Sequence, residues 1–336
     1  MNHFYYLSDL GEINLPSVVE IDYIEVVNKE KIILFLDSCV CLDIINFIRQ
    51  KEKTKIDKTK IFSLIEYAQK NEVKVTPIFA LMELCYDRTT NKMKYDKLWE
   101  FKNIIDFAIK QPIEITKQFD FDYEVDYEPF RGKLLLPNDD EMPLIDNINQ
   151  SYVGLLKIRE LTSLGLKKKC AEKNINLFVD WMINDLDRFL GFEYFLALEI
   201  FGGNNKMRSM IKLDSTPEKA KTTLWGTAWD LFHARFNCDR LQVEQIVRVK
   251  PYPIFVTKDY ALYKLMSPCL LFNIQHEFGR LKYSKEYVYP KHFSCDCISR
   301  LNAKISNLAD DRFGRKPTWN ANKIKLMIRE LEERLI

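Results

Sequence analysis

Four apolar segments of the sequence each contain or precede one acidic residue, and this pattern constrains the fold and its chemistry more than any other feature. The acids and their segments are Asp37 directly after 31–36, Glu83 within 77–85, Asp230 within 227–236 and Asp259 within 253–262. A charge in such surroundings is costly unless it is paired or bound to a metal. The four acids are therefore candidates for one shared site.

The first ninety residues alternate between predicted strands and predicted helices. Residues 31–37 are mostly apolar and predict a buried strand, whereas 58–70 carries apolar residues at helical spacing. Residues 73–76 predict a second, short strand, and Pro77 suits the start of the helix that carries Glu83. Strands that alternate with helices are typical of a parallel α/β sheet.

A carboxylate directly after a buried strand lies at the carboxyl edge of the sheet, where open parallel sheets bind their ligands. Three or four carboxylates that meet there, without cysteine or histidine partners, describe a site for a hard cation such as Mg²⁺ or Mn²⁺. Each acid alone also has an ordinary interpretation. Asp37 suits a turn or a helix N-cap, and Glu83 and Asp230 suit a solvated helix face.

Four short motifs around these acids resemble those of the PIN-domain nucleases. They are Phe-Leu-Asp-Ser-Cys at 35–39, Glu-Leu-Cys-Tyr-Asp-Arg at 83–88, Ala-Trp-Asp-Leu-Phe-His-Ala at 228–234 and Val-Thr-Lys-Asp-Tyr-Ala-Leu at 256–262. The resemblance implies a parallel sheet flanked by helices. It also implies that the acids hold Mg²⁺ or Mn²⁺ and that the protein hydrolyses phosphodiester bonds, most often in RNA.

The same resemblance implies a role for each residue of the site. The residues that match the family's first to fourth acids, and would be the catalytic residues and metal ligands, are Asp37, Glu83, Asp230 and Asp259. Thr257 takes the place of the threonine in the family's Thr-x-Asp element. Thr257 or Ser38 would contact a carboxylate ligand or a bound water, rather than the metal itself, and orient it.

The resemblance covers about 30–90 and 220–275, with many more residues between the second and third acids than a compact family member needs. We therefore expect an α/β fold with a PIN-like core, a large, mostly helical insertion and a helical C-terminal tail. The expected parts are a core of 1–90 and 220–275, an insertion of 91–219 and a C-terminal extension of 276–336.

Composition narrows the class of protein. The 336 residues are 47% hydrophobic, which is ample for a core, and no window approaches the roughly 20 apolar residues of a transmembrane helix. The N-terminus lacks the basic and apolar regions of a signal peptide. Most of the eight cysteines lie in apolar segments and predict small buried side chains. We expect a cytoplasmic protein with no membrane partner.

Local charge is more informative than the net charge of +2. The segments 51–60, 167–169 and 312–316 are basic, and each is either a solvated face or a track for phosphates. The segment 119–128 alternates acids with aromatic or aliphatic residues, and it is either a solvated loop, an autoinhibitory strip or a partner's docking edge.

Other chemistry receives less support. Cys295 and Cys297 with His292 nearby lack the paired Cys-x-x-Cys clusters of zinc sites. His233 lies one turn after Asp230, and a packed core histidine is favoured over a contact with substrate phosphate. For Asp43 we favour a place on a helix surface over one in the site. No glycine-rich phosphate loop is present.

The leading functional hypothesis is a metal-dependent endoribonuclease. The usual roles of proteins in the resembled family, together with the Lys-, Ile- and Asn-rich composition, favour a bacterial toxin or an anti-phage effector. RNA is favoured over DNA, and a regulatory protein or a second copy of the chain are further candidate partners. Two alternatives stay open: a structure-specific DNA nuclease, and a catalytically silent PIN-like binding module.

Overall fold

The computed structural model describes residues 4–8, 11–49, 56–117, 144–269, 273–277, 280–284, 289–312, 318 and 320–335. These residues fall into two compact units, one within Met1–Pro143 and His233–Tyr263 and the other within Leu144–Phe232 and Lys264–Ile336. Helix α10 (Pro217–Cys238) carries residues of both units, because the division falls between Phe232 and His233. The units are described separately below.

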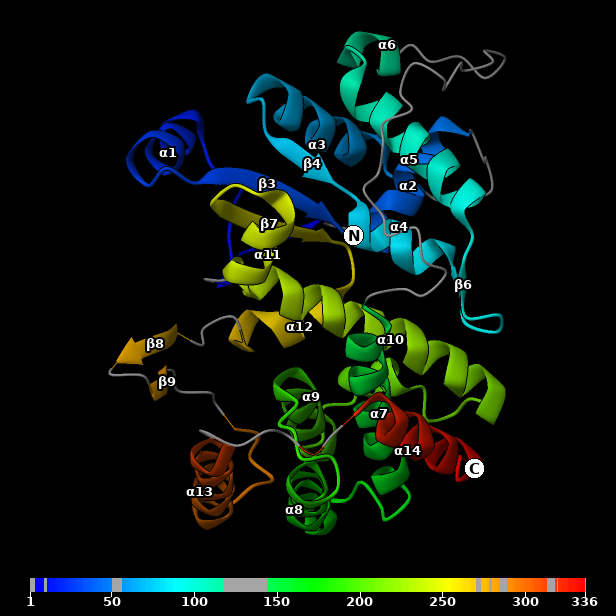
Figure 1. Ribbon diagram of the computed structural model, residues 1–336, viewed down its shortest axis with the longest axis vertical. Helices are drawn as coiled ribbons and strands as arrows, with labels where there is room; N and C mark the ends of the chain where they lie inside the picture. The colour runs from blue at the N-terminus through cyan, green and yellow to red at the C-terminus, as the bar shows by residue number, and fades with distance from the viewer. Residues whose placement is uncertain are drawn as a thin grey trace. The chain divides into compact units, whose positions relative to one another are not determined.

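The first unit is built on a five-stranded sheet (Figure 1). The strands, in their order across the sheet, are β2 (Gly11–Glu12), β1 (Tyr5–Ser8), β7 (Pro251–Thr257), β3 (Lys31–Leu36) and β4 (Lys74–Thr76). Strand β3 pairs in parallel with both β7 and β4, whereas β1 pairs antiparallel with β7 and β2. The three parallel strands therefore end at one common edge.

Strand β3 is buried on both faces, which explains its nearly continuous apolar sequence. Alternate side chains of a strand point to opposite faces. Ile32 and Leu34 belong to the core cluster that the helices of this unit build. Phe35 lies on the other face, where its ring stacks on that of Phe79 at 6.1 Å between centroids.

Helices cover this sheet. The helical elements of the first unit are α1 (Val18–Asp22), the π-helical turn η1 (Tyr23–Val27), α2 (Ser38–Ile48), α3 (Lys58–Lys70), α4 (Ile78–Cys85), α5 (Tyr95–Lys110), α6 (Ile113–Lys117) and α11 (Arg240–Val247). A small hairpin, β5 (Tyr86–Asp87) and β6 (Lys92–Met93), connects α4 to α5. Helix α5 packs against α2, α3 and α4 (Figure 1).

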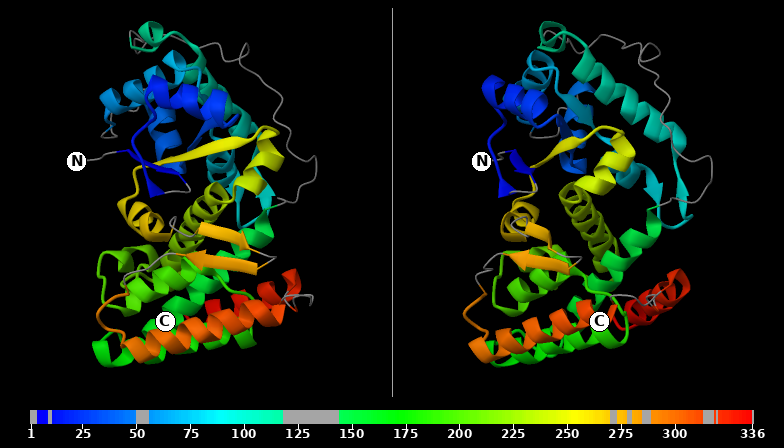
Figure 2. Two further views of the ribbon diagram at one scale, coloured as in Figure 1. Left: turned by 90° about the vertical axis from the view of Figure 1, so that its left-hand side faces the viewer. Right: turned by 60° about the vertical axis from the view of Figure 1, so that its left-hand side comes forward.

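The second unit is mainly helical. Its elements include α7 (Ile145–Thr162), α8 (Lys168–Asn184), α9 (Gly191–Phe201), the 3₁₀ turn η3 (Met207–Ile211), α13 (Cys295–Arg312), α14 (Ala321–Glu333) and the hairpin of β8 (Asn273–Glu277) and β9 (Arg280–Ser284). Helix α14 packs along α7, and α13 packs along α8 (Figure 2). Helix α12 (Tyr260–Cys269) begins in the first unit and ends in the second.

The sheet confirms the coarse expectation of an α/β fold with parallel strands flanked by helices. The two compact units differ from the expected core of 1–90 and 220–275, insertion of 91–219 and extension of 276–336. Helix α5, expected in the insertion, contributes Leu98 and Ile104 to the same core cluster as β3. Its amphipathic pattern showed that one face is buried but not which element covers that face.

Several other expectations fall on parts of the chain that lie outside the described residues. They are the acidic segment 119–128, residues 51–55 of the basic segment 51–60 and residues 313–316 of the basic segment 312–316. Within the described part of the chain, no helix combines the length and the apolar character that crossing a membrane requires.

One buried arginine of the second unit connects helix α7 to the turn that follows η3. The guanidinium of Arg159, on α7, donates hydrogen bonds to the backbone carbonyls of the turn after η3. Its Nη1 bonds Ile211 at 2.6 Å and also Lys212, and its Nη2 bonds Leu213 at 3.3 Å and Ser215 at 3.1 Å. A planar, forked donor is needed to satisfy several carbonyls at once.

Replacing this residue with lysine is expected to lower the free energy of unfolding by about 2–4 kcal/mol, because one ammonium cannot reach all of these carbonyls. Urea denaturation of Arg159→Lys measures the effect. The matched control is Arg334→Lys, which alters an exposed arginine that pairs with Glu160. Equal midpoints for the two variants would contradict this account of the turn.

Candidate metal centre

Asp37 lies where β3 ends and α2 begins, and it is almost completely buried, with 1% of its surface exposed. Its Oδ1 accepts a hydrogen bond from the backbone nitrogen of Ser38 at 2.7 Å, so Asp37 is the N-cap of α2. Its Oδ2 accepts from the hydroxyl of Thr257 at 2.5 Å and from the thiol of Cys39 at 2.9 Å. These donors hold the carboxylate in one orientation.

The pairing of two parallel strands brings Asp37 and Thr257 together. In the register of β3 and β7, Leu36 lies opposite Val256. The backbone nitrogen of Asp37 continues the ladder by donating to the carbonyl of Val256 at 2.9 Å. The next residue of each strand therefore arrives at the same edge of the sheet, as the sequence predicted for a carboxylate after a buried strand.

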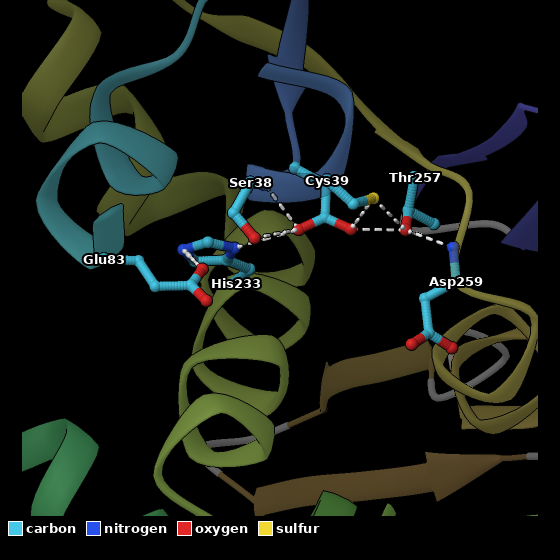
Figure 3. A network of polar contacts seen from close by, with 7 residues as sticks. Ser38, Cys39, Glu83, His233, Thr257 and Asp259 are labelled. Carbon is cyan, nitrogen blue, oxygen red and sulfur yellow. Dashed lines mark hydrogen bonds and ion pairs between the residues drawn. The ribbon is translucent and has the colours of Figure 1, made fainter. Parts of the chain in front are cut away.

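Glu83 and His233 approach this carboxylate from two helices, α4 and α10 (Figure 3). The Nδ1 atom of His233 lies 3.8 Å from Oδ1 of Asp37, and its Nε2 atom lies 3.9 Å from Oε2 of Glu83. One ligand atom from each residue lies within 4.8 Å of the other two. Among the described residues, these three form the one group of this kind.

Burial makes the Glu83 carboxyl hard to ionise. Its Oε2 atom is buried and has no hydrogen-bond partner within the described part of the chain. Desolvation raises the pKa of Glu83 to about 7, with the lowering effect of His233 opposed by the negative charge of Asp37. A bound cation would favour the ionised form and occupy the unpaired oxygen.

Asp37 shows the opposite behaviour. Burial alone would raise the pKa of its carboxyl group, but the electrostatic interaction with His233 and the hydrogen bonds from Cys39 and Thr257 outweigh burial and lower the pKa. The two carboxyl groups thus differ in their affinity for protons although they share one histidine neighbour. Asp37 is the one that stays ionised.

Cys39 contributes to the site as a hydrogen-bond donor, which the sequence did not indicate. Desolvation and the charge of Asp37 raise the pKa of its thiol well above the ordinary value. The thiol therefore keeps its proton and donates a hydrogen bond to Oδ2 of Asp37. From the sequence, a cysteine near the start of an apolar helix is expected to be a small buried side chain. The group that its thiol contacts depends on the local turn, which the sequence does not show.

The other two predicted acids are placed differently. Asp259 is exposed, and its Oδ1 accepts from the backbone nitrogen of Leu262 at 2.9 Å, at the start of α12. Its backbone nitrogen donates to the hydroxyl of Thr257 at 3.0 Å (Figure 3). Asp230 is half-buried on α10 and belongs to the second unit. Neither joins the group of three ligand atoms, and their roles as ligands stay predictions.

Two residues with open interpretations can now be located. His233 is buried, with 3% of its surface exposed, and its ring packs against Phe79 and Phe255. It is thus a packed histidine, as favoured from the sequence, but one that also faces both carboxylates. Asp43, on α2, accepts a hydrogen bond from the ammonium of Lys258 at 2.6 Å and lies outside the group.

Comparisons with models of known protein families, with characterised proteins and with solved structures find no significant match to this chain. The resemblance to PIN-domain nucleases accordingly rests on the motifs quoted from the sequence. What the site does chemically is inferred from the geometry and burial of its own residues.

The raised pKa of Glu83 has a consequence for stability in the absence of metal. Between pH 4.5 and about 7 the folded chain binds more protons at this residue than the unfolded chain, so its stabilising contribution is complete below pH 4.5 and is lost as pH rises through 7. The total change is on the order of 3 kcal/mol. Glu83→Gln removes this loss, so the variant should gain stability relative to the wild type as pH rises.

Urea denaturation in EDTA at several pH values between 4.5 and 8 tests the expectation. The quantity to compare is the slope of the unfolding free energy against pH, since the amide itself can shift the absolute value. Glu66→Gln, at an exposed glutamate on α3, is the matched control and should keep the wild-type slope. Parallel profiles for Glu83→Gln and the wild type would contradict the assignment.

Proposed function

We propose that this protein is a divalent-metal-dependent nuclease with a PIN-like core, and that its substrate is RNA. The observation that carries the proposal is the convergence of two carboxylates, Asp37 and Glu83, at the carboxyl edge of the parallel strands. Oxygen ligands at such an edge suit a hard cation, Mg²⁺ or Mn²⁺. The four motifs quoted from the sequence support the family and the choice of RNA.

The residues present fit such a cation. The carboxylates of buried Asp37 and half-buried Glu83 repel each other when both are ionised, and burial adds to that cost. The unpaired Oε2 of Glu83 is directed into the group of ligand atoms rather than toward another protein donor. A cation there would offset the repulsion and satisfy this oxygen.

The remaining residues act by holding Asp37 in place. The backbone nitrogen of Ser38 fixes one oxygen of the carboxylate, while the hydroxyl of Thr257 and the thiol of Cys39 fix the other. A divalent cation, when bound, would supply the positive charge that activates water and offsets the charge of the phosphate. No side-chain nucleophile is required. Asp230 and Asp259 are proposed as further acids of the site on the strength of the resemblance alone.

The biological setting is also proposed from the resemblance. A toxin or an anti-phage effector is the favoured role, with RNA bound partly through the basic segments 51–60 and 312–316. A regulatory protein or a second copy of the chain would hold the activity in check. Cytoplasmic location follows from the same setting.

One specific observation favours a rival function, the silent PIN-like binding module. His233 lies between the two carboxylates, and a protonated imidazole would balance their charge without any metal. In that case the cluster would be a structural ion pair within the core. A structure-specific DNA nuclease remains the alternative within the enzyme class, and substrate assays separate it from the RNA nuclease.

The proposal is tested with labelled RNA, single-stranded DNA and duplex DNA, each incubated with Mg²⁺, Mn²⁺ or EDTA. RNA should be cleaved in the metal-containing samples and spared in EDTA. Asp37→Asn should lower the rate at least about 100-fold, because it removes a charged ligand while keeping the shape of the side chain. Thermal melting of the variant shows whether the fold is retained.

The matched control is Asp43→Asn, which makes the same chemical change on the same helix but outside the group of ligand atoms. It should cleave at close to the wild-type rate. Full activity in Asp37→Asn would overturn the assignment of the site. Cleavage confined to DNA would replace RNA with the DNA alternative, and no cleavage of any substrate would favour the silent module.

A further inference from the structure

Three tyrosines of the first unit form an aromatic cluster beside the end of β7. The ring of Tyr5, on β1, stacks on that of Tyr263, on α12, with 4.2 Å between the centroids and 12° between the ring planes. Tyr260, the first residue of α12, packs against both rings, at 6.2 Å from Tyr5 and 6.0 Å from Tyr263. All three residues belong to the same compact unit as Asp37.

The three rings differ in their exposure. Tyr263 is buried, with 7% of its surface exposed, and its hydroxyl donates a hydrogen bond to the carboxylate of Glu12. Tyr5 is half-buried within the antiparallel pairing of β1 and β7. Tyr260, in contrast, keeps 43% of its surface exposed. An aromatic ring whose position is already fixed by packing loses little conformational entropy when a ligand covers it.

Short connections place this cluster near the candidate metal centre. In the register of β1 and β7, Tyr5 lies opposite Thr257, whose hydroxyl donates to Oδ2 of Asp37 at 2.5 Å. The same hydroxyl accepts a hydrogen bond from the backbone nitrogen of Asp259 at 3.0 Å (Figure 3), and Tyr260 is the next residue. The Cα atom of Tyr260 therefore lies within about 11 Å of the Asp37 carboxylate, since consecutive Cα atoms are about 3.8 Å apart.

A nucleobase is the ligand that suits an exposed aromatic ring close to a site for phosphodiester cleavage. Every base has a flat face that stacks on an aromatic side chain, and this contact contributes affinity in proteins that bind single strands. The bases of a duplex are already stacked on one another, so proteins stack their rings on the unpaired bases of single strands. At the roughly 3.4 Å rise of a stacked strand, the distance from Asp37 to Tyr260 corresponds to at most about three nucleotides.

We propose that the exposed ring of Tyr260 is a stacking site for one unpaired nucleobase of the substrate, within about three nucleotides of the phosphate that is cleaved. The inference rests on the proposed function, because it names the form of RNA that the same site accepts. Tyr5 and Tyr263 hold the ring of Tyr260 in place. The contact uses the face of the ring and not its hydroxyl, and it selects single-stranded RNA over duplex RNA.

A binding assay with matched RNA probes tests the stacking site in the unmodified protein. The probes are a short single-stranded RNA, whose phosphorothioate backbone slows cleavage, and versions of it that lack the base at one position. Fluorescence anisotropy in Mn²⁺ measures the affinity of each probe for the wild type. Removing the base at one particular position should weaken binding about 5- to 100-fold, and removal elsewhere should have a smaller effect. The corresponding RNA duplex should bind more weakly than the single strand.

Variants of the protein connect this position of the RNA to Tyr260. Tyr260→Ala should bind the complete RNA as weakly as the wild type binds the RNA without that base, and removing the base should then have no further effect. Tyr260→Phe keeps the ring and should bind like the wild type. The matched control is Tyr23→Ala, at an exposed tyrosine on η1, which should keep the wild-type affinity.

Thermal melting shows whether each variant is folded. If Tyr260→Ala does not fold, Tyr260→Leu removes the aromatic face while it keeps an apolar side chain of similar reach, and the same loss of affinity is expected.

The outcomes distinguish this inference from the proposed function. Cleavage of RNA by the wild type, together with unchanged affinity in the folded Tyr260 variants, would overturn the stacking site and leave the nuclease in place. Equal affinity of the wild type for single-stranded and duplex RNA would overturn the selection of single strands. Binding that depends on Tyr260 without any cleavage would support the stacking site and overturn the catalytic assignment. Neither binding nor cleavage of RNA would overturn both.

Discussion

The parallel pairing of β3 with β7 is the constraint on which the candidate site depends. Its register places Leu36 opposite Val256 and delivers the next residues, Asp37 and Thr257, to one edge of the sheet. Two hydrogen bonds follow from this register: the backbone nitrogen of Asp37 donates to the carbonyl of Val256, and the hydroxyl of Thr257 donates to the carboxylate of Asp37. A shift of one residue would turn every side chain of the strand to the other face and remove the carboxylate from its donors.

The same edge sets the electrostatics of the two acids. Asp37 is surrounded by donors, which together with His233 keep its pKa low in spite of burial. Glu83 comes from a helix and keeps a buried oxygen without a partner, so its pKa is raised. Carboxyl groups whose environments drive their pKa values apart are common in sites that bind cations or move protons.

Local sequence signals predicted the parts of the fold that depend on local physics. The strand before Asp37 and the helix at 58–70 were identified from their apolar spacing, because burial on one or two faces imposes that spacing. The place of α5 was not predicted, since an amphipathic helix reveals a buried face but not its partner. Boundaries between the two units depend on such partners.

The candidate site shows the same limit. Asp37 and Glu83 were singled out because acids within apolar segments are unusual, and the structure brings them together. His233 was seen only as a packed histidine, because its approach to both acids depends on helix α10 and the sheet in three dimensions. Asp259 follows a strand as predicted, but its carboxylate caps α12, the ordinary role of an acid before a helix.

The central claim is that Asp37 and Glu83 hold a divalent cation. A crystal of the protein grown with Mn²⁺, with diffraction recorded at a wavelength where manganese scatters anomalously, tests it most directly. The account predicts an anomalous peak about 2.0–2.3 Å from a carboxylate oxygen of each acid. A map with no peak between these two side chains, at a Mn²⁺ concentration that saturates binding in solution, would contradict it.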